Sequence, residues 1–216
     1  PISIKSKPLS VWIFFERNLL PFSYILYIVH NITSLTDEEL AKRSVSDTAA
    51  FCELIERYNA MLLRYVIRRS HATKEDAEDV VQNSFIKMYR NINDFDPSLK
   101  FSSWAYRITH NELIDWYRKQ KSRPQLIIGD KDEDIFSSIA GDMNIEKEAI
   151  QKETKKEIEK IIQELDPKYQ EIITLRFFEE KSYDEISDIL QIPAGTVAIR
   201  LSRAKKILQD SLKAYS

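Results

Sequence analysis

Apolar side chains recur every three or four residues along most of this chain, the spacing that places them on one face of an α-helix. Between residues 35 and 121 the pattern predicts four helices. The first three follow side chains that can cap a helix N-terminus, Thr36, Asp47 and Thr73. The fourth follows a turn-rich segment and runs to about Lys121. These four helices are expected to form a first small domain.

A second group of helices is predicted between residues 146 and 216. An amphipathic helix covers 146–165. Asp166 followed by Pro167 is typical of the start of the next helix, which runs to about Phe178. The expected fold class is therefore all-α, with two small helical domains joined by a flexible linker.

The last two helices of the second domain are separated by a tight turn. Ser182 and Glu185 have capping-box spacing at the start of the first helix. Pro193 and Gly195 break the apolar pattern, since proline has no amide hydrogen and glycine tolerates positive φ, and Thr196 is expected to cap the second helix. A short helix, a tight turn and a basic second helix are typical of a helix-turn-helix, whose second helix lies in the DNA major groove. The alternative is an ordinary helical hairpin with a solvated charged face.

The distribution of charge favours the helix-turn-helix. The whole chain has a net charge of −2, but residues 194–213 hold five Lys or Arg against one Asp, a local net charge of +4. Residues 100–123 also carry +4, from six basic and two acidic side chains, whereas 130–148 carries −5, from seven acidic and two basic ones. Two basic segments separated by an acidic one indicate two surfaces for nucleic acid and a connector that does not bind it.

The composition supports helices and offers no candidate active site. Gly is scarce, with 3 residues, and charged residues reach 31%. The single cysteine, Cys52, lies beside Phe51 in an apolar stretch and is expected to be a buried, inert thiol. The three histidines lie far apart, and no zinc-binding, phosphate-binding or catalytic motif is found. No catalytic residue, metal, cofactor or small-molecule substrate is therefore expected, and a helical enzyme is the least favoured class.

The helix over 104–121 carries aromatic side chains on more than one face, interleaved with Arg and Lys. Exposed rings can stack on unpaired bases while cations follow the phosphates, as single-stranded DNA binding requires. The alternative is that the same rings simply pack the core of the first domain.

The helix after Thr73 begins with an acidic face, made of Glu75, Asp76, Glu78 and Asp79. Acidic side chains in a first helical turn interact favourably with the helix dipole, which is a purely structural explanation. The functional alternative is a docking face for a basic partner.

Residues 1–34 form an N-terminal extension that does not continue this pattern. Pro1–Asn31 is apolar and aromatic, but Glu16, Arg17 and Pro21 interrupt it, so neither half reaches the roughly 18 apolar residues of a membrane span. A basic start before an apolar run is typical of a signal peptide, yet no small-residue cleavage site follows. We interpret the segment as an artefact or a fragment of an upstream reading frame. A peripheral membrane or partner-docking segment and a true span are the alternatives.

Several motifs, taken in order, resemble the extracytoplasmic-function (ECF) group of bacterial RNA polymerase sigma factors in the sigma-70 family. In the first domain the matching stretches are AEDVVQNSF at 77–85, FSSWAYRI at 101–108 and NELIDWYR at 111–118. In the second domain they are LDPKY at 165–169, LR at 175–176, SYDEI at 182–186, IPAGTV at 192–197 and RLSRA at 200–204. Each piece alone is weak, but the combination is specific and covers about Leu35 to Leu212.

The resemblance implies a non-enzymatic subunit that binds core RNA polymerase and directs it to particular promoters. The polymerase clamp helices would contact a face made of Glu78, Asp79, Gln82 and Phe85. The melted −10 strand would be captured by Asn91, Phe101, Trp104, Arg107, Asn111, Trp116 and Arg118. The −35 duplex would be read by Thr196, Ala198, Ile199, Arg200, Ser202, Arg203 and Lys205.

One departure from the family concerns the −35 contacts. Ala198 and Ile199 stand where relatives often have basic or small polar residues. This removes potential hydrogen-bond donors to base edges and leaves apolar contacts, such as those to a thymine methyl group. The −35 sequence is therefore not transferable from relatives.

The implied organisation is an extension at 1–34, a region 2-like domain at 35–121, an acidic linker at 122–145 and a region 4-like helix-turn-helix domain at 146–216. The implied partners are core RNA polymerase, promoter DNA and an anti-sigma factor, which would act on the protein in the cytoplasm or hold it at the inner membrane. The competing hypothesis is an autonomous helix-turn-helix regulator that binds palindromic sites without polymerase.

Overall fold

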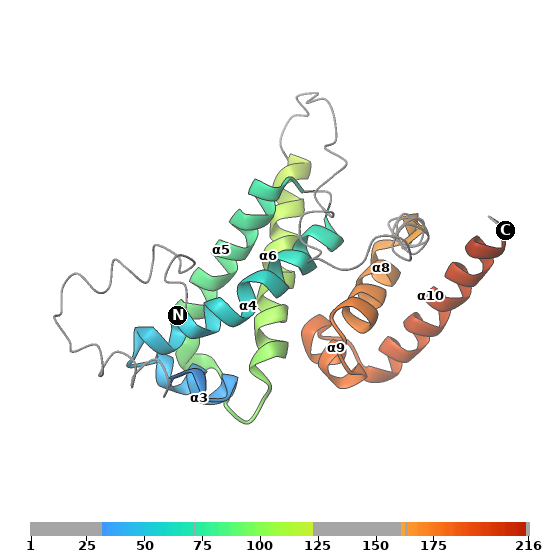
Figure 1. Ribbon diagram of the computed structural model, residues 1–216. Coiled ribbons are helices and arrows are strands. Elements are labelled where there is room, and N and C mark those ends of the chain that lie inside the picture. The colour runs from blue at the N-terminus through green and yellow to red at the C-terminus, as the bar shows by residue number, and fades with distance from the viewer. Residues whose placement is uncertain (1–31, 71, 123–160, 163, 215–216) are drawn as a thin grey trace, which may run out of the picture.

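The computed structural model describes residues 32–70, 72–122, 161–162 and 164–214 (Figure 1). Every regular element in these residues is helical, which confirms the expected all-α class. None of the helices they contain is long and apolar enough to cross a bilayer. Most of the N-terminal extension, nearly all of the linker and most of the helix expected over 146–165 lie outside the described residues.

The first domain consists of α3 (Asp37–Ser44), α4 (Thr48–Arg69), α5 (Lys74–Arg90), the short 3-10 helix η2 (Ile92–Asp94) and α6 (Phe101–Ser122). The three expected N-caps, Thr36, Asp47 and Thr73, are confirmed, since each accepts a hydrogen bond from a backbone amide two or three residues later. Thr36 also forms a full capping box with Glu39.

Large side chains from all four α-helices fill the core of this domain. The fully buried ones include Leu40, Leu54, Leu62, Tyr65, Met88, Phe101, Tyr106 and Leu113. Aromatic rings meet edge to face, with centroids 5.2 Å apart for Tyr58 and Phe101 and 5.3 Å apart for Tyr65 and Tyr106. Much of the aromatic content of α6 therefore serves packing, which was the structural alternative for these rings.

Cys52 is exposed, so the expectation of a buried thiol is wrong. One step along an α-helix turns the side chain by about 100°. Phe51 lies in the core, so this rotation directs the side chain of Cys52 toward solvent. Partial burial, followed by the nearby carboxylates of Glu56 and Asp47, raises the pKa of the thiol, which therefore stays protonated at neutral pH.

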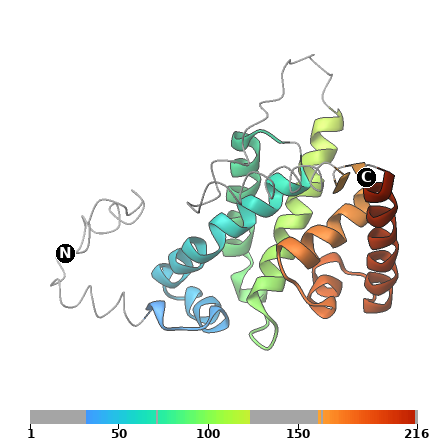
Figure 2. The same cartoon turned by 45° about the vertical axis from the view of Figure 1, so that its right-hand side comes forward.

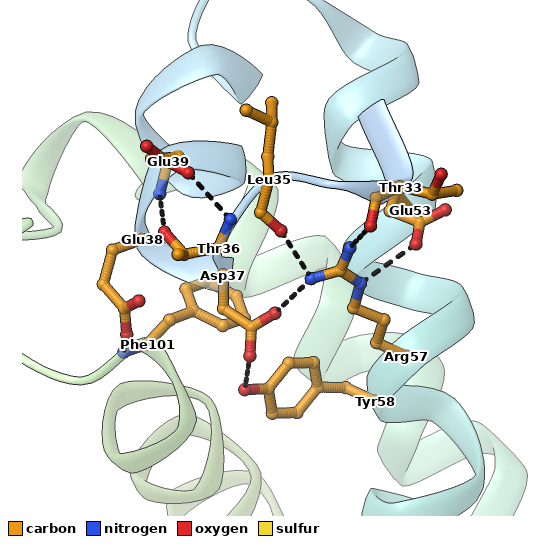
Figure 3. Close-up of polar contacts among 10 residues, drawn as sticks. All are labelled: Thr33, Leu35, Thr36, Asp37, Glu38, Glu39, Glu53, Arg57, Tyr58 and Phe101. Carbon is orange, nitrogen blue, oxygen red and sulfur yellow. Dashed lines mark hydrogen bonds and ion pairs between the residues drawn. The ribbon is translucent and has the colours of Figure 1, made fainter. Parts of the chain in front are cut away.

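Arg57 ties α3 and the segment before it to α4 (Figure 3). Its guanidinium donates to the backbone carbonyls of Thr33 (2.9 Å) and Leu35 (3.0 Å) and to the carboxylates of Asp37 (2.8 Å) and Glu53 (2.9 Å). Asp37 also accepts a hydrogen bond from the hydroxyl of Tyr58, which is 3% exposed. Burial and this carboxylate raise the pKa of Tyr58, so its hydroxyl keeps the proton it donates.

Replacing Asp37 with alanine is expected to lower the free energy of unfolding by about 2 kcal/mol, because a buried donor without an acceptor costs roughly 1–3 kcal/mol. Urea denaturation followed by circular dichroism measures the change. Glu56→Ala, at an exposed position of α4, is the control and should stay within about 0.5 kcal/mol of the unsubstituted protein. A loss for Asp37→Ala no larger than the control would contradict this role.

The helix α3 also caps α6. The carboxylate of Glu38 accepts a hydrogen bond from the amide of Phe101, the first residue of α6, at 3.0 Å (Figure 3). The residue before it, Lys100, has no side-chain acceptor with which to cap the helix. The start of α6 is therefore fixed by a neighbouring helix rather than by its own sequence.

The second domain consists of α8 (Pro167–Ile173), η3 (Thr174–Phe178), α9 (Tyr183–Leu190) and α10 (Ala194–Ala214). The expected cap at Asp166 and the capping box of Ser182 with Glu185 are confirmed. The segment η3 is a π-helical turn that continues α8 to the expected end at Phe178. The core of this domain is built from Ile172, Ile173, Leu175, Ile186, Ile189, Val197 and Leu201.

The helix-turn-helix is present, with two differences at its turn. The residue with positive φ is Gln191, at 54°, and not Gly195. The helix α10 begins at Ala194, so the expectation that Thr196 caps it is wrong. The amide of Thr196 donates instead to the carbonyl of Pro193 at 2.8 Å, so Thr196 already lies within the first turn of α10.

The two domains lie side by side (Figures 1 and 2). The first helix of the helix-turn-helix, α9, packs against α6, and η3 touches α4. The helix α10 packs on α8 and α9, on the far side of α9 from the first domain. The helix α9 thus lies between the two helices predicted to contact DNA, α6 and α10.

Candidate nucleic-acid and polymerase interface

The helix α10 keeps an outward face that does not contribute to the core. Its inward side chains Val197, Leu201 and Ala204 are at most 1% exposed. All the side chains predicted to read the −35 duplex are exposed or half-exposed: Thr196, Ala198, Ile199, Arg200, Ser202, Arg203 and Lys205. Ile199 is 56% exposed, unusually open for a large apolar residue. An apolar centre flanked by cations suits contact with thymine methyl groups and phosphates.

The residues predicted to capture the −10 strand lie on α6 and just after α5, and they differ in exposure. Exposed positions are Asn91, Asn111 and Arg118, and half-buried positions are Trp104, Arg107 and Trp116. The ring of Trp104 packs against Phe95 and Phe101, with centroids 5.3 and 5.7 Å away. Phe101 is fully buried, so its placement among base-stacking residues needs correction. It belongs to the core, where it packs against Trp104.

The acidic face of α5 is open to solvent. Asp79 and Gln82 are exposed and Glu78 is half-buried. Phe85 does not share this face, because it is 7% exposed and packs edge to face on Phe51 at 6.5 Å between centroids. Its assignment to the docking face is corrected, since its ring is occupied inside the domain.

The exposed face of α5 extends further than the sequence analysis anticipated. Ile86 is 48% exposed and follows Asp79 by seven residues, which is two helical turns. Tyr89 is 46% exposed, and its ring packs against that of Phe51 with centroids 5.0 Å apart. Both were missed although they stand outside the core stripe of this helix. The resulting face is acidic at its start and apolar at its end.

Comparison with known proteins decides the family. The sequence matches the models for sigma-70 region 2 over residues 54–123 and for sigma-70 region 4 over residues 155–208. It is 34% identical over 171 residues to the ECF RNA polymerase sigma factor SigW of Bacillus subtilis, which aligns 77% of this chain with 91% of SigW. The chain belongs to the ECF sigma factors of the sigma-70 family.

Further relatives agree with this membership. The ECF RNA polymerase sigma-E factor of Haemophilus influenzae is 32% identical over 194 residues, covering 83% of this chain and 96% of that protein. Among solved structures, CnrH in complex with the cytosolic domain of CnrY superposes with a TM-score of 0.61 at 25% identity, covering 83% of this chain and 99% of CnrH. The sigma factor RpoE of Bartonella quintana, in complex with the anti-sigma factor NepR, has the same fold, with a TM-score of 0.55 at 23% identity and coverage of 76% and 96%.

The matched regions of this ECF sigma factor coincide with the faces described above. Region 2 spans most of α4, all of α5 and all of α6, and so includes the acidic face and the half-buried tryptophans. Region 4 spans α8, η3, α9 and most of α10. Phe177, on η3, is exposed and lies beside the helix predicted to read DNA, although it was not among the predicted site residues. Its ring lies 5.4 Å from the ammonium of Lys205, so it contributes to the same surface.

Proposed function

We propose that this ECF sigma factor binds core RNA polymerase through α5, captures the melted −10 strand with α6 and reads the −35 duplex with α10. It performs no catalysis of its own and acts in the cytoplasm, where the polymerase and the chromosome meet. Asp79, Gln82 and Ile86 would contact the polymerase. Trp104, Arg107, Asn111, Trp116 and Arg118, with Asn91 at the preceding turn, would hold the unpaired strand.

The exposed outer face of α10 supports this proposal most directly. The side chains of Ile199, Ser202 and Arg203 are free of the core, whereas those of Val197 and Leu201 on the same helix are buried. A helix whose one side anchors it in a helix-turn-helix and whose other side carries cations is arranged to enter the major groove. Because the chain is an ECF sigma factor, we propose that the DNA bound by this helix is a promoter element.

An anti-sigma factor is the expected regulator of this protein. The structures of CnrH and of the Bartonella quintana RpoE were both solved as complexes, the latter with an anti-sigma factor, and both resemble this chain along most of its length. We propose a partner of the same class here.

Permanganate footprinting tests the proposed function, because permanganate oxidises unpaired thymines. Core polymerase together with this protein should expose thymines near position −10 of genomic promoter fragments, and neither component alone should do so. Binding of the protein alone to palindromic duplexes, without any melted thymine when polymerase is added, would contradict the proposal and favour an autonomous regulator.

Ile199 is expected to set the preferred base at one −35 position. Ile199→Asn should shift the preference from thymine toward adenine, because an alkyl group packs on the thymine methyl whereas an amide can bond adenine in a bidentate manner. Such a bidentate pair discriminates against the wrong base by roughly 1–3 kcal/mol. Transcription from a library with a randomised −35 element, followed by sequencing of the products, measures the shift. Gln209→Asn, at another exposed position of α10, is the control and should leave the preference unchanged. An Ile199→Asn library indistinguishable from that of the unsubstituted protein would place Ile199 outside the base contacts.

A further inference from the structure

Two carboxylates lie on the side of α6 that is proposed to hold the unpaired −10 strand. Asp115 follows Asn111 by four residues and precedes Arg118 by three, so these three side chains share one face of the helix. Glu112 precedes Trp116 by four residues. A strand that contacts Asn111, Trp116 and Arg118 therefore brings its phosphates close to both carboxylates, and charges of the same sign repel each other.

The ammonium of Lys87, on α5, contacts both of these carboxylates. It forms an ion pair with Oε2 of Glu112 and lies 3.5 Å from Oδ2 of Asp115. The other oxygen of Asp115, Oδ1, accepts a hydrogen bond from Arg118 at 3.3 Å. One cation from the neighbouring helix thus serves two carboxylates, and the cluster of two cations and two carboxylates carries no net charge.

These side chains differ in burial. The side chain of Glu112 is 6% exposed, whereas those of Asp115 and Arg118 are 42% and 75% exposed. The hydrogen bond to Glu112 raises the pKa of Lys87 above its ordinary value, against the effect of desolvation, and the charge of Asp115 adds to the rise. A buried carboxylate needs a paired cation, which Lys87 supplies for Glu112, while Asp115 and Arg118 stay open to a ligand.

The backbone of Lys87 is also held in place, at the end of α5. Its carbonyl accepts a hydrogen bond from the side-chain amide of Asn91 at 2.8 Å and another from the backbone amide of Asn91 at 3.1 Å. Asn91 is itself among the residues proposed to hold the strand. Lys87 thus connects the turn after α5 with the carboxylates of α6.

Lys87 does not share the proposed docking face of α5. It follows Ile86 by one residue, and one step along an α-helix turns the side chain by about 100°. Its ammonium accordingly reaches α6, which packs on α5 (Figure 1), whereas Asp79, Gln82 and Ile86 are exposed. The charge of Lys87 therefore acts on the side of the domain proposed to bind DNA.

We infer that Lys87 is a positioning residue for −10 capture: its ammonium compensates Glu112 and Asp115, so that the phosphates of the unpaired strand can approach α6. This inference deepens the proposed function and rests on it, because that function assigns this side of α6 to the strand. Without Lys87 the cluster holds two carboxylates and one cation, so the same face repels phosphate. Asp115 then also competes with phosphate for the guanidinium of Arg118.

Two other roles for Lys87 make different predictions. A lysine that contacts a phosphate itself loses that contact whether or not a carboxylate lies beside it. A lysine that only fastens α5 to α6 is not replaced by a neutral side chain at the exposed Asp115. Only a lysine that acts by compensating charge becomes dispensable once its carboxylates are neutral.

Binding of a single strand by core polymerase saturated with this protein tests the inference. The probe is a fluorescein-labelled oligonucleotide with the sequence of the permanganate-reactive strand, and its anisotropy is measured. All variants carry Glu112→Gln, because a buried carboxylate left without its cation could unfold the domain. In this background Lys87→Gln should weaken binding of the strand about tenfold, or about 1.4 kcal/mol.

The loss caused by Lys87→Gln is then measured again with Asp115→Asn present. It should shrink to within about threefold, because side chains in contact act non-additively and neither carboxylate remains to be compensated. The control is Asp210→Asn, the same change at an exposed position of α10 in the other domain, and it should leave the loss unchanged. A loss that Asp115→Asn does not shrink overturns the inference and indicates a direct contact with phosphate. A loss that Asp210→Asn shrinks equally also overturns it, since net charge would then be the cause.

Two further measurements separate charge compensation from docking and from a structural role. Lys87→Arg keeps the charge and should retain binding of the strand within about twofold. Lys87→Gln should leave the affinity for core polymerase unchanged, because the ammonium faces α6. A Lys87→Arg variant as weak as Lys87→Gln, or a loss of polymerase affinity as large as the loss for the strand, would overturn the inference.

Failure of the proposed function gives a different result. If core polymerase binds the strand equally well with and without this protein, both the proposed function and the inference are overturned. If the protein strengthens binding of the strand and Lys87→Gln does not weaken it, the inference alone is overturned.

Discussion

Replacing Asp79 with arginine is expected to abolish the binding of core RNA polymerase while the helical fold stays intact. Asp79 is exposed in the second turn of α5, on the same face as Gln82 and Ile86. A like charge placed opposite a basic partner surface costs several kcal/mol, which corresponds to a loss of affinity of at least about 100-fold. Fluorescence anisotropy of labelled protein titrated with core enzyme measures that affinity.

The matched control is Glu56→Arg, the same reversal of charge at an exposed position of α4. It should bind core enzyme with unchanged affinity. Circular dichroism should report the same helix content for both variants, because neither side chain lies in the core. If Asp79→Arg still binds like the unsubstituted protein, the docking face is not on this side of α5.

Replacing Arg203 with alanine is expected to reduce transcription that depends on the −35 element by about 5- to 150-fold, because a bidentate contact from arginine to a base is worth roughly 1–3 kcal/mol. Arg203 is exposed on the outer face of α10, next to Ser202 and one turn beyond Ile199. Transcription assays on promoters with intact and scrambled −35 elements measure the loss. Polymerase binding should not change, since α5 supplies the proposed docking face.

Arg203→Lys separates contact with a base from contact with a phosphate. Lysine keeps the charge but lacks the planar fork that pairs with a guanine edge. Loss of specificity with retained affinity for DNA in Arg203→Lys would match a base contact. Full activity in this variant would assign Arg203 to a phosphate instead, and a loss of polymerase binding in Arg203→Ala would contradict the placement altogether.

Local features of the fold could be predicted from the sequence because their causes lie within a few residues. The capping box of Ser182 with Glu185 depends on a hydroxyl and a glutamate three positions apart, and it forms as expected. Thr36 and Glu39 have the same spacing and form a second capping box. The same is true of Pro167 after Asp166 at the start of α8. At the turn of the helix-turn-helix, glycine was expected to be the residue with positive φ. Gln191 has the positive φ there instead of Gly195.

Burial of single aromatic side chains could not be predicted from spacing alone. Phe101 and Phe85 lie in motifs that carry the family resemblance, and both are packed in the core of the first domain. A helix with aromatics on several faces can bury any of them, depending on which neighbouring helices surround it. Here the rings of Tyr58 and Phe95 pack against Phe101, and the ring of Phe51 packs against Phe85.

The contacts between the two domains could not be predicted at all from local patterns. Arg68 and Glu179 are 111 positions apart, and an isolated arginine on a helix surface gives no sign of a distant partner. The charge pattern identified the basic segment at 100–123, but it gave no sign that Lys100 pairs with Glu185, 85 positions away, at 3.1 Å.

The most direct test of the central claim is run-off transcription with purified core RNA polymerase, with and without this protein, on genomic promoter fragments. A sigma factor predicts transcripts that start at defined positions only when the protein is present, and their start sites would locate the −10 and −35 elements together. No protein-dependent transcript on any fragment, combined with tight binding of duplex DNA by the protein alone, would contradict that account.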